Sequence, residues 1–145
     1  MLLRTRTALP LFRIGFNYTL FSVLKHIVPV TSLVRWAWLP GRPASLPASD
    51  LAVSAVRWIQ RRAARGTPTD CLQAALVLYR ELSRAGTDPH LVMGFARDAA
   101  GLVGHAWVEV GGSPVAETVD DVSRFTRTAT FGTHGRRLDP GPRDA

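Results

Sequence analysis

The single cysteine of this 145-residue chain, Cys71, stands where a helix is predicted to begin. Thr67, Pro68 and Asp70 precede it and fit a capping box with a proline at the first helical position. A thiol in the first turn of a helix faces unpaired backbone N–H groups and the positive end of the helix dipole. Both favour the thiolate, which is the nucleophilic form of cysteine. Cys71 is therefore either a nucleophile or a small buried core residue, and a general base nearby would favour the first reading.

The candidate base is His105, which lies in the middle of a predicted strand with the sequence LVGHAWVEV. The other histidines occur in an apolar helix, a turn and a glycine-flanked segment near the C-terminus. Because side chains alternate across a strand, His105, Trp107 and Glu109 share one face, and small and aliphatic residues form the opposite, core-facing one. We expect the helix that carries Cys71 to cover the His105 face. His105 is then either a general base for Cys71 or a half-exposed strand histidine.

An imidazole base works best when an acid fixes its tautomer and its orientation. Glu117 is the candidate acid, because it lies on the predicted strand that follows the strand of His105. Glu109, Asp120 and Asp121 are the alternatives, and each of them is otherwise an ordinary surface charge.

The turn between these two strands decides whether Glu117 can reach the imidazole. A two-residue turn at 111–112 places Glu117 opposite Ala106, which is the wrong face of the sheet. A three-residue loop places Glu117 beside His105 instead, and such loops end in a left-handed residue, which suits Gly112. The catalytic triad therefore predicts a bulged hairpin.

Periodicity, prolines and glycines predict the elements that must position these residues. Apolar residues at helical spacing predict one or two helices over residues 8–39, with a break at Pro29. Prolines make 39–50 a linker or an extended loop, and a further helix begins at Ser49 or Asp50. The helix of Cys71 ends at Gly86, and strands are predicted at 90–97, 102–110 and 113–118, with a further strand or helix at 124–131.

This order of helices followed by antiparallel strands predicts an α+β fold. We divide the chain into an apolar helical segment with its linker over residues 1–48, a catalytic domain over 49–135 and a frayed tail over 136–145. One cysteine excludes an intramolecular disulfide, and the histidine spacing fits no zinc site. We therefore expect neither a disulfide-stapled scaffold nor a metal enzyme.

The net charge of +7 comes from 18 basic residues, of which all but Lys25 are arginines. The arginines are scattered and match no nucleic-acid-binding motif, so nucleic acid is not an expected partner. In the apolar N-terminal block, the stretch Ile14–Leu24 has no basic residue but is far shorter than the roughly 20 residues of a membrane span. No signal-peptide cleavage site follows a clean apolar run. We expect a cytoplasmic protein, for which peripheral membrane contact is not favoured.

Two stretches of the chain resemble a known family. DCLQAALVLYRELSRAG, followed by PHLVMGFARDAAGLVGHAWVEVGGSPVAE, is similar to the leader peptidases of lasso-peptide biosynthesis, which are transglutaminase-like cysteine proteases, here in the small stand-alone form. The shared pattern is Cys-Leu at a helix start, a HAW-x-E strand and a segment leading to an acid, and it covers about residues 55–118. The resemblance implies a transglutaminase-like, papain-like core, in which a catalytic cysteine at a helix N-terminus packs on an antiparallel sheet.

Carried over by position, the resemblance implies that Cys71 is the nucleophile, His105 the general base and Glu117 the orienting acid. Many relatives have aspartate at the last place, so the glutamate is a departure from the family pattern. Trp107 is expected to form a wall of the peptide-binding cleft. Gln73 is expected to contact the substrate as a side chain of the oxyanion site.

The implied reaction is hydrolysis of the bond between leader and core in a ribosomally made lasso-peptide precursor, through a thioester and without a cofactor. Family members of this split type work in bacteria with a separate leader-binding protein and with an ATP-dependent macrocyclase. The apolar N-terminal block and the positive charge are the features that would serve those contacts.

Two other functions fit the same residues. A transglutaminase-like acyltransferase would pass the thioester to an amine, and the sequence does not separate water from an amine as the acceptor. A non-catalytic peptide-binding or membrane-associated protein would contain an unreactive Cys71.

Overall fold

The computed structural model of the chain describes residues 3–42, 47–63 and 71–138. The capping box predicted at 67–70 lies outside these residues. The order of the elements confirms the predicted α+β class. The helices are α1 (Leu3–Leu24), α2 (Val30–Ala37), α3 (Pro47–Ala63), α4 (Cys71–Arg84) and the short α5 (Val119–Ser123). The strands are β1 (Pro89–Asp98), β2 (Gly101–Val110), β3 (Ser113–Val115), β4 (Thr126–Phe131) and β5 (Arg137–Leu138).

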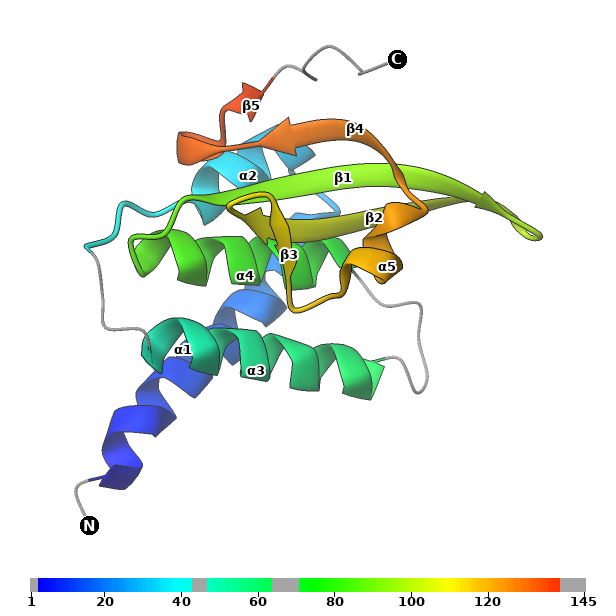
Figure 1. Ribbon diagram of the computed structural model, residues 1–145. Coiled ribbons are helices and arrows are strands. Elements are labelled where there is room, and N and C mark those ends of the chain that lie inside the picture. The colour runs from blue at the N-terminus through cyan, green and yellow to red at the C-terminus, as the bar shows by residue number, and fades with distance from the viewer. Residues whose placement is uncertain (1–2, 43–46, 64–70, 139–145) are drawn as a thin grey trace.

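The strands form one five-stranded antiparallel sheet in the order β3-β2-β1-β4-β5. The long hairpin of β1 and β2 lies over α4, and α4 in turn lies between the sheet and the helices α1 and α3 (Figure 1). The strand or helix predicted at 124–131 is β4, which pairs with β1 on the side away from β2. The segment between β3 and β4, which contains α5, therefore crosses over the β1–β2 hairpin.

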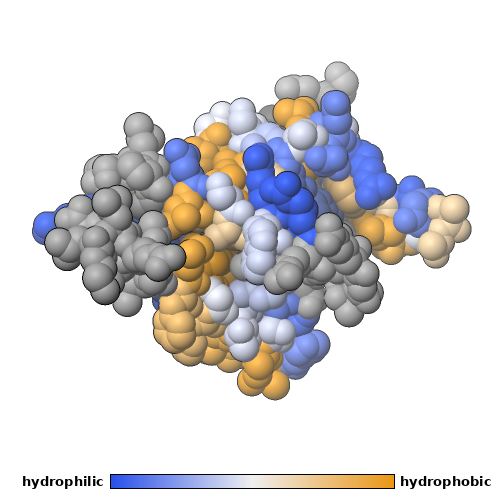
Figure 2. Space-filling model, turned by 90° about the horizontal axis from the view of Figure 1, so that it is seen from below, coloured by the Kyte–Doolittle hydropathy of each residue, from blue (hydrophilic) through white to orange (hydrophobic). Residues whose placement is uncertain are grey.

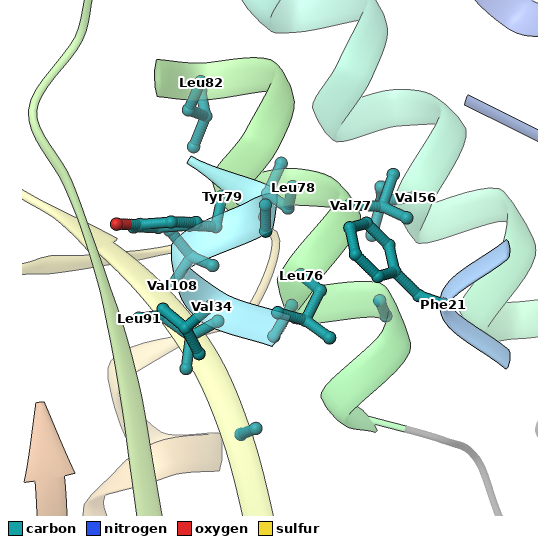
Figure 3. Close-up of a cluster of buried hydrophobic side chains, with 14 of the residues drawn as sticks. Phe21, Val34, Val56, Leu76, Val77, Leu78, Tyr79, Leu82, Leu91 and Val108 are labelled. Carbon is teal, nitrogen blue, oxygen red and sulfur yellow. The ribbon is translucent and has the colours of Figure 1, made fainter. Parts of the chain in front are cut away.

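Helix α4 is the centre of the core, and most of its side chains are buried. Figure 3 shows Phe21 of α1 and Val56 of α3 on one side of this helix, and Leu91 and Val108 of the sheet on the other. Each buried aliphatic side chain of this kind contributes about 1.5–3 kcal/mol to folding. The packing therefore fixes the position of α4, and with it the place of Cys71 at its first residue.

Different elements cover the two faces of the sheet. Ala106 of β2 packs with α4 in the main core, whereas Trp107 packs with Phe125, which follows α5. We expected the helix of Cys71 to cover the face of His105, and that expectation is wrong, because α4 covers the opposite face. The strand alternation itself is as predicted, with the small and aliphatic residues facing the main core.

The N-terminal helices belong to the same core as the rest of the domain. Ile14 and Phe21 of α1 and Leu33 of α2 are almost fully buried in the cluster that contains α4. The boundary expected after residue 48 therefore does not separate two cores. The break predicted at Pro29 is confirmed, since α2 begins directly after this residue. Among the described residues, no helix is both long enough and apolar enough to cross a membrane.

The chain beyond β4 is tied to α4 by Tyr79. The hydroxyl of this residue donates to the carbonyl oxygen of Gly132 and accepts from the N–H of Gly135, whose nitrogen lies 3.1 Å away. Burial raises the pKa of Tyr79 to about 12. We expected a frayed tail from residue 136, but β5 pairs with β4, and only 139–145 lie outside the described residues.

Candidate active site

Cys71 is the first residue of α4, and its side chain is partly buried. The N–H groups of the first turn of a helix have no acceptor within that helix, so they are free to bond a group placed beside them. The positive end of the helix dipole also lies at this end. The fold therefore places Cys71 where backbone N–H groups can bond the oxygen of a carbonyl attacked by the sulfur.

Cys71 and His105 come from opposite faces of the sheet and meet at the edge of β2. Within the described part of the chain, β3 pairs with β2 only over Val108–Val110, so the edge of β2 is open at His105. Here Cys71, His105 and Glu117 line one pocket with a volume of about 600 Å³. The structure thus brings together the three residues that the sequence singled out. The remaining lining residues are Val103, Gly104, Asp120, Asp121, Arg124 and Phe125.

One hydrogen bond fixes the imidazole of His105. Its Nε2 atom lies 2.6 Å from Oε2 of Glu117, and the side chain of Cys71 interacts with the same ring. The ring stacks on Phe125, with 4.8 Å between the centroids. The interaction with Cys71, and after it the hydrogen bond to Glu117, raises the pKa of His105 to about 9, although burial opposes this. The imidazole is therefore protonated near neutral pH and suited to pair with a Cys71 thiolate.

The hairpin that leads to Glu117 does not have the predicted register. Val110 pairs with Ser113, so the turn contains only Gly111 and Gly112, and both have positive φ angles of 60° and 80°. This is the backbone of a tight two-residue hairpin, in which glycine is favoured because both positions are left-handed. The predicted three-residue bulged loop is therefore wrong. Continued beyond β3, the observed register would place Glu117 on the α4 face of the sheet.

Glu117 nevertheless reaches His105, because the strand stops before it. β3 ends at Val115, and Ala116 has a φ angle of 70°, in the left-handed region. This one residue breaks the alternation of side chains and turns Glu117 to the other face. A left-handed conformation costs a residue with a Cβ atom about 1–2 kcal/mol. The neighbouring packing and hydrogen bonds must offset that cost.

The residues on either side of Glu117 are anchored. The carbonyl oxygen of Ala116 accepts a hydrogen bond from Nε of Arg57, which lies in α3, at 3.2 Å. The N–H of Thr118 donates to Oδ2 of Asp121 at 3.0 Å, and the Thr118 hydroxyl accepts from the N–H of Asp121. The hydrogen bonds from Thr118 hold the pKa of the Asp121 carboxyl below its ordinary value. Asp121, one of the alternative acids, is therefore engaged in capping α5.

Glu109, another alternative acid, belongs to a buried network away from the pocket. It accepts hydrogen bonds from Nε1 of Trp107 at 2.8 Å and from both terminal nitrogens of Arg127 at 2.9 and 2.7 Å. Trp107 is only 2% exposed and does not line the pocket. Trp107 therefore does not form the cleft wall that we expected. Phe125, which stacks on His105, lies in that place.

Gln73 also faces away from the pocket. Its side chain is 1% exposed, and its amide nitrogen donates to the carbonyl oxygen of Tyr18 at 3.4 Å. Its amide oxygen accepts from Nζ of Lys25 at 3.1 Å. Gln73 thus joins α4 to the N-terminal helix and the turn after it, and the substrate contact predicted for its side chain is wrong. The backbone N–H groups at the start of α4 are left as the donors beside Cys71.

Sequence reasoning did not identify Arg124 and Phe125 as pocket residues. A signal was present, because Thr118 and Asp121 form the [ST]-x-x-[DE] pattern of a capping box, which predicts a helix from residue 119. That helix, α5, directs the residues after it over the sheet. Within the described residues, no cluster of His, Cys, Asp and Glu side chains is arranged to hold a metal ion.

Comparison with known proteins agrees with this geometry. The sequence model of the transglutaminase-like superfamily matches residues 23–130, a span that contains Cys71, His105 and Glu117. No curated protein and no solved structure matches the chain. Members of this superfamily are typically enzymes of the cysteine protease and transglutaminase type. The match spans most of the chain, from the end of α1 to β4, and the chain therefore belongs to the transglutaminase-like superfamily.

Proposed function

We propose that the chain is a cysteine peptidase that cleaves the bond between leader and core in a lasso-peptide precursor. The observation that supports a peptidase is the convergence of Cys71, His105 and Glu117 in one open pocket, where His105 is hydrogen-bonded to Glu117 and interacts with Cys71. The choice of lasso-peptide precursors as the substrate rests on the resemblance of residues 55–118 to the leader peptidases.

The proposed reaction begins with attack of the Cys71 thiolate on the carbonyl carbon of the scissile peptide bond. The oxyanion of the tetrahedral intermediate accepts hydrogen bonds from backbone N–H groups at the start of α4. Protonated His105 gives its proton to the leaving nitrogen, the C–N bond breaks, and a thioester on Cys71 remains. Neutral His105 then takes a proton from water as the water attacks the thioester. The acid product leaves, and the released thiolate again pairs with the imidazolium.

Glu117 has two roles in this scheme. Its carboxylate fixes the orientation of the imidazole through the 2.6 Å hydrogen bond. Its negative charge also stabilises the protonated ring, which is the form that pairs with the thiolate and delivers the proton. All the groups in this scheme come from the chain itself, so the proposed peptidase uses no cofactor.

The second candidate is an acyltransferase that forms the same thioester and passes the acyl group to an amine. The open pocket beside Cys71 admits either acceptor. The product separates the two reactions, because hydrolysis adds one water and aminolysis adds the amine.

Incubation with a lasso precursor, followed by intact-mass spectrometry, tests the peptidase. The native chain should give two fragments whose masses sum to the precursor plus one water. Cys71→Ala should lower the rate by more than about 10³-fold, because it removes the nucleophile. Ser113→Ala, an exposed change in β3, is the matched control and should cleave normally. An amine adduct would favour the acyltransferase, and full activity in Cys71→Ala would contradict both enzymes.

The rate of cleavage should depend on pH through His105. A pKa raised from 6.5 to about 9 means that the imidazolium is present at neutral pH, so kcat/KM should fall as the pH rises through about 9. The stability that this proton contributes is complete below about 6.5 and is lost as the pH rises through about 9. Glu117→Gln removes a charge that supports the imidazolium, and should move the falling limb to lower pH.

The control for this shift is Asp120→Asn. It removes a carboxylate from the same pocket but leaves the hydrogen bond between His105 and Glu117 in place. The fall of kcat/KM at high pH should move less in Asp120→Asn than in Glu117→Gln. Equal pH profiles for the native chain and Glu117→Gln would contradict the role given to Glu117.

We further propose that α1 contacts a separate leader-binding protein, which in turn brings the precursor and places the chain beside an ATP-dependent macrocyclase. Four apolar side chains on one face of α1, Phe12, Phe16, Leu20 and Val23, are 39–76% exposed. Figure 2 shows broad apolar surface on the side of the molecule where α1 and α3 lie. No acidic residue precedes Asp50, so this part of the chain also favours a partner with negative charge.

Substitution of exposed residues on this face tests the contact and leaves the buried residues of α1 unchanged. Phe12→Ser with Phe16→Ser should weaken binding to a leader-binding protein of lasso-peptide biosynthesis by at least about tenfold, measured by calorimetry. Trp36→Ser is the matched control, because Trp36 is 57% exposed but lies on α2. Deletion of α1 is unsuitable, since Ile14 and Phe21 are core residues. Unchanged affinity in the double variant, with an intact thermal transition, would exclude this face.

A further inference from the structure

We propose that Ala116 is a positioning residue, whose left-handed backbone, held by Arg57, directs Glu117 onto His105. The inference rests on the proposed function, in which Glu117 orients the base. It goes beyond that function because neither Ala116 nor Arg57 touches the reacting groups, yet together they decide on which face of the sheet the acid lies.

The register of the hairpin makes such a device necessary. Val108 pairs with Val115, so a continued strand would place Ala116 opposite Trp107 and Glu117 opposite Ala106. Ala106 faces α4 and the main core, where a carboxylate would be buried without a partner. The φ angle of 70° at Ala116 ends the strand and moves Glu117 to the side of His105. The left-handed conformation of Ala116 thus has the effect that the sequence assigned to a bulged hairpin loop, which is to place Glu117 beside His105.

Two anchors, one on each side, hold Glu117 in place. Before it, Nε of Arg57 donates to the carbonyl oxygen of Ala116, which ties the turn to α3. After it, Thr118 and Asp121 bond one another through the capping box of α5. The position of the acid is therefore set by α3 and α5, neither of which carries a member of the triad.

The residue type at position 116 limits which conformations are open to the turn. Glycine adopts the left-handed region freely, alanine adopts it with strain, and a β-branched residue is excluded from it almost entirely. Substitution at Ala116 can therefore switch the turn between left-handed and extended backbone without removing any charged group from the pocket.

The charged and titratable groups around His105 are few. Cys71 faces it from α4, Glu117 from the turn after β3, and Asp120, Asp121 and Arg124 line the pocket from α5 and the residue that follows. Asp121 is bound in the α5 cap. Of these groups, Glu117 is the acid that hydrogen-bonds the ring, and its contact is the one that the turn controls.

The test is an NMR titration of the His105 ring in Ala116→Val, Ala116→Gly and the native chain, which needs no substrate. In Ala116→Val, the midpoint should fall from about 9 toward the ordinary 6.5, by about one unit or more, because Glu117 no longer meets the ring. Ala116→Gly keeps the left-handed turn and should keep the native midpoint. A native midpoint in Ala116→Val, or an equal fall in both variants, would overturn the proposal.

Ser113→Val is the folding control, because it introduces valine three residues earlier, in β3 itself, at an exposed residue. It should leave the midpoint unchanged. Arg57→Ala should also lower the midpoint of the His105 titration, but by less than Ala116→Val does. An unchanged midpoint in Arg57→Ala would overturn the role assigned to Arg57.

The failures of the two proposals can be told apart. If the midpoints behave as expected and the native chain cleaves no peptide, the proposed function fails and the positioning stands. If the native chain cleaves and Ala116→Val keeps its midpoint, the positioning fails alone.

Discussion

The hydrogen bond between His105 and Glu117 is the contact on which the rest of the site depends. It joins two side chains that the hairpin register alone would place on opposite faces of the sheet. The bond exists because Ala116 leaves the strand in a left-handed conformation. It contributes to a raised pKa of His105, and the protonated ring is the partner that a Cys71 thiolate requires. The strained turn at Ala116 thus contributes to the raised pKa of His105.

The fold supplies the second requirement, which is a fixed place for the thiol. Helix α4 is buried between the sheet and the N-terminal helices, so its first residue cannot move independently of the core. Cys71 approaches from the α4 side of the sheet and His105 from the other side. They meet because β3 is short and leaves the edge of β2 open. The open edge is therefore as important to the site as the residues themselves.

Much of the fold could be predicted from local patterns, including the cysteine helix, the β1–β2 hairpin and the break at Pro29. The same patterns identified Cys71, His105 and Glu117 as one candidate triad, and the structure places all three in one pocket. The left-handed turn at Ala116 could not be predicted, since alanine disfavours this region and nothing in its type indicates that it adopts it. The place of β4 beside β1 is a long-range pairing that periodicity does not reveal. Trp107 lies on the predicted face of the strand, but Val122 and Phe125 bury it there, and this packing is not visible in the spacing. Gln73 is buried against the N-terminal helix, a contact that the spacing also does not reveal.

Alkylation of Cys71 by iodoacetamide, followed across pH in the native chain and in His105→Ala, tests the central claim most directly. The chain has no other cysteine, so the label reports this thiol alone. The ion pair predicts fast labelling of the native chain at neutral pH. It also predicts much slower labelling of His105→Ala, whose rate rises only at alkaline pH. Equal pH profiles for the two proteins would contradict the pairing of Cys71 with His105.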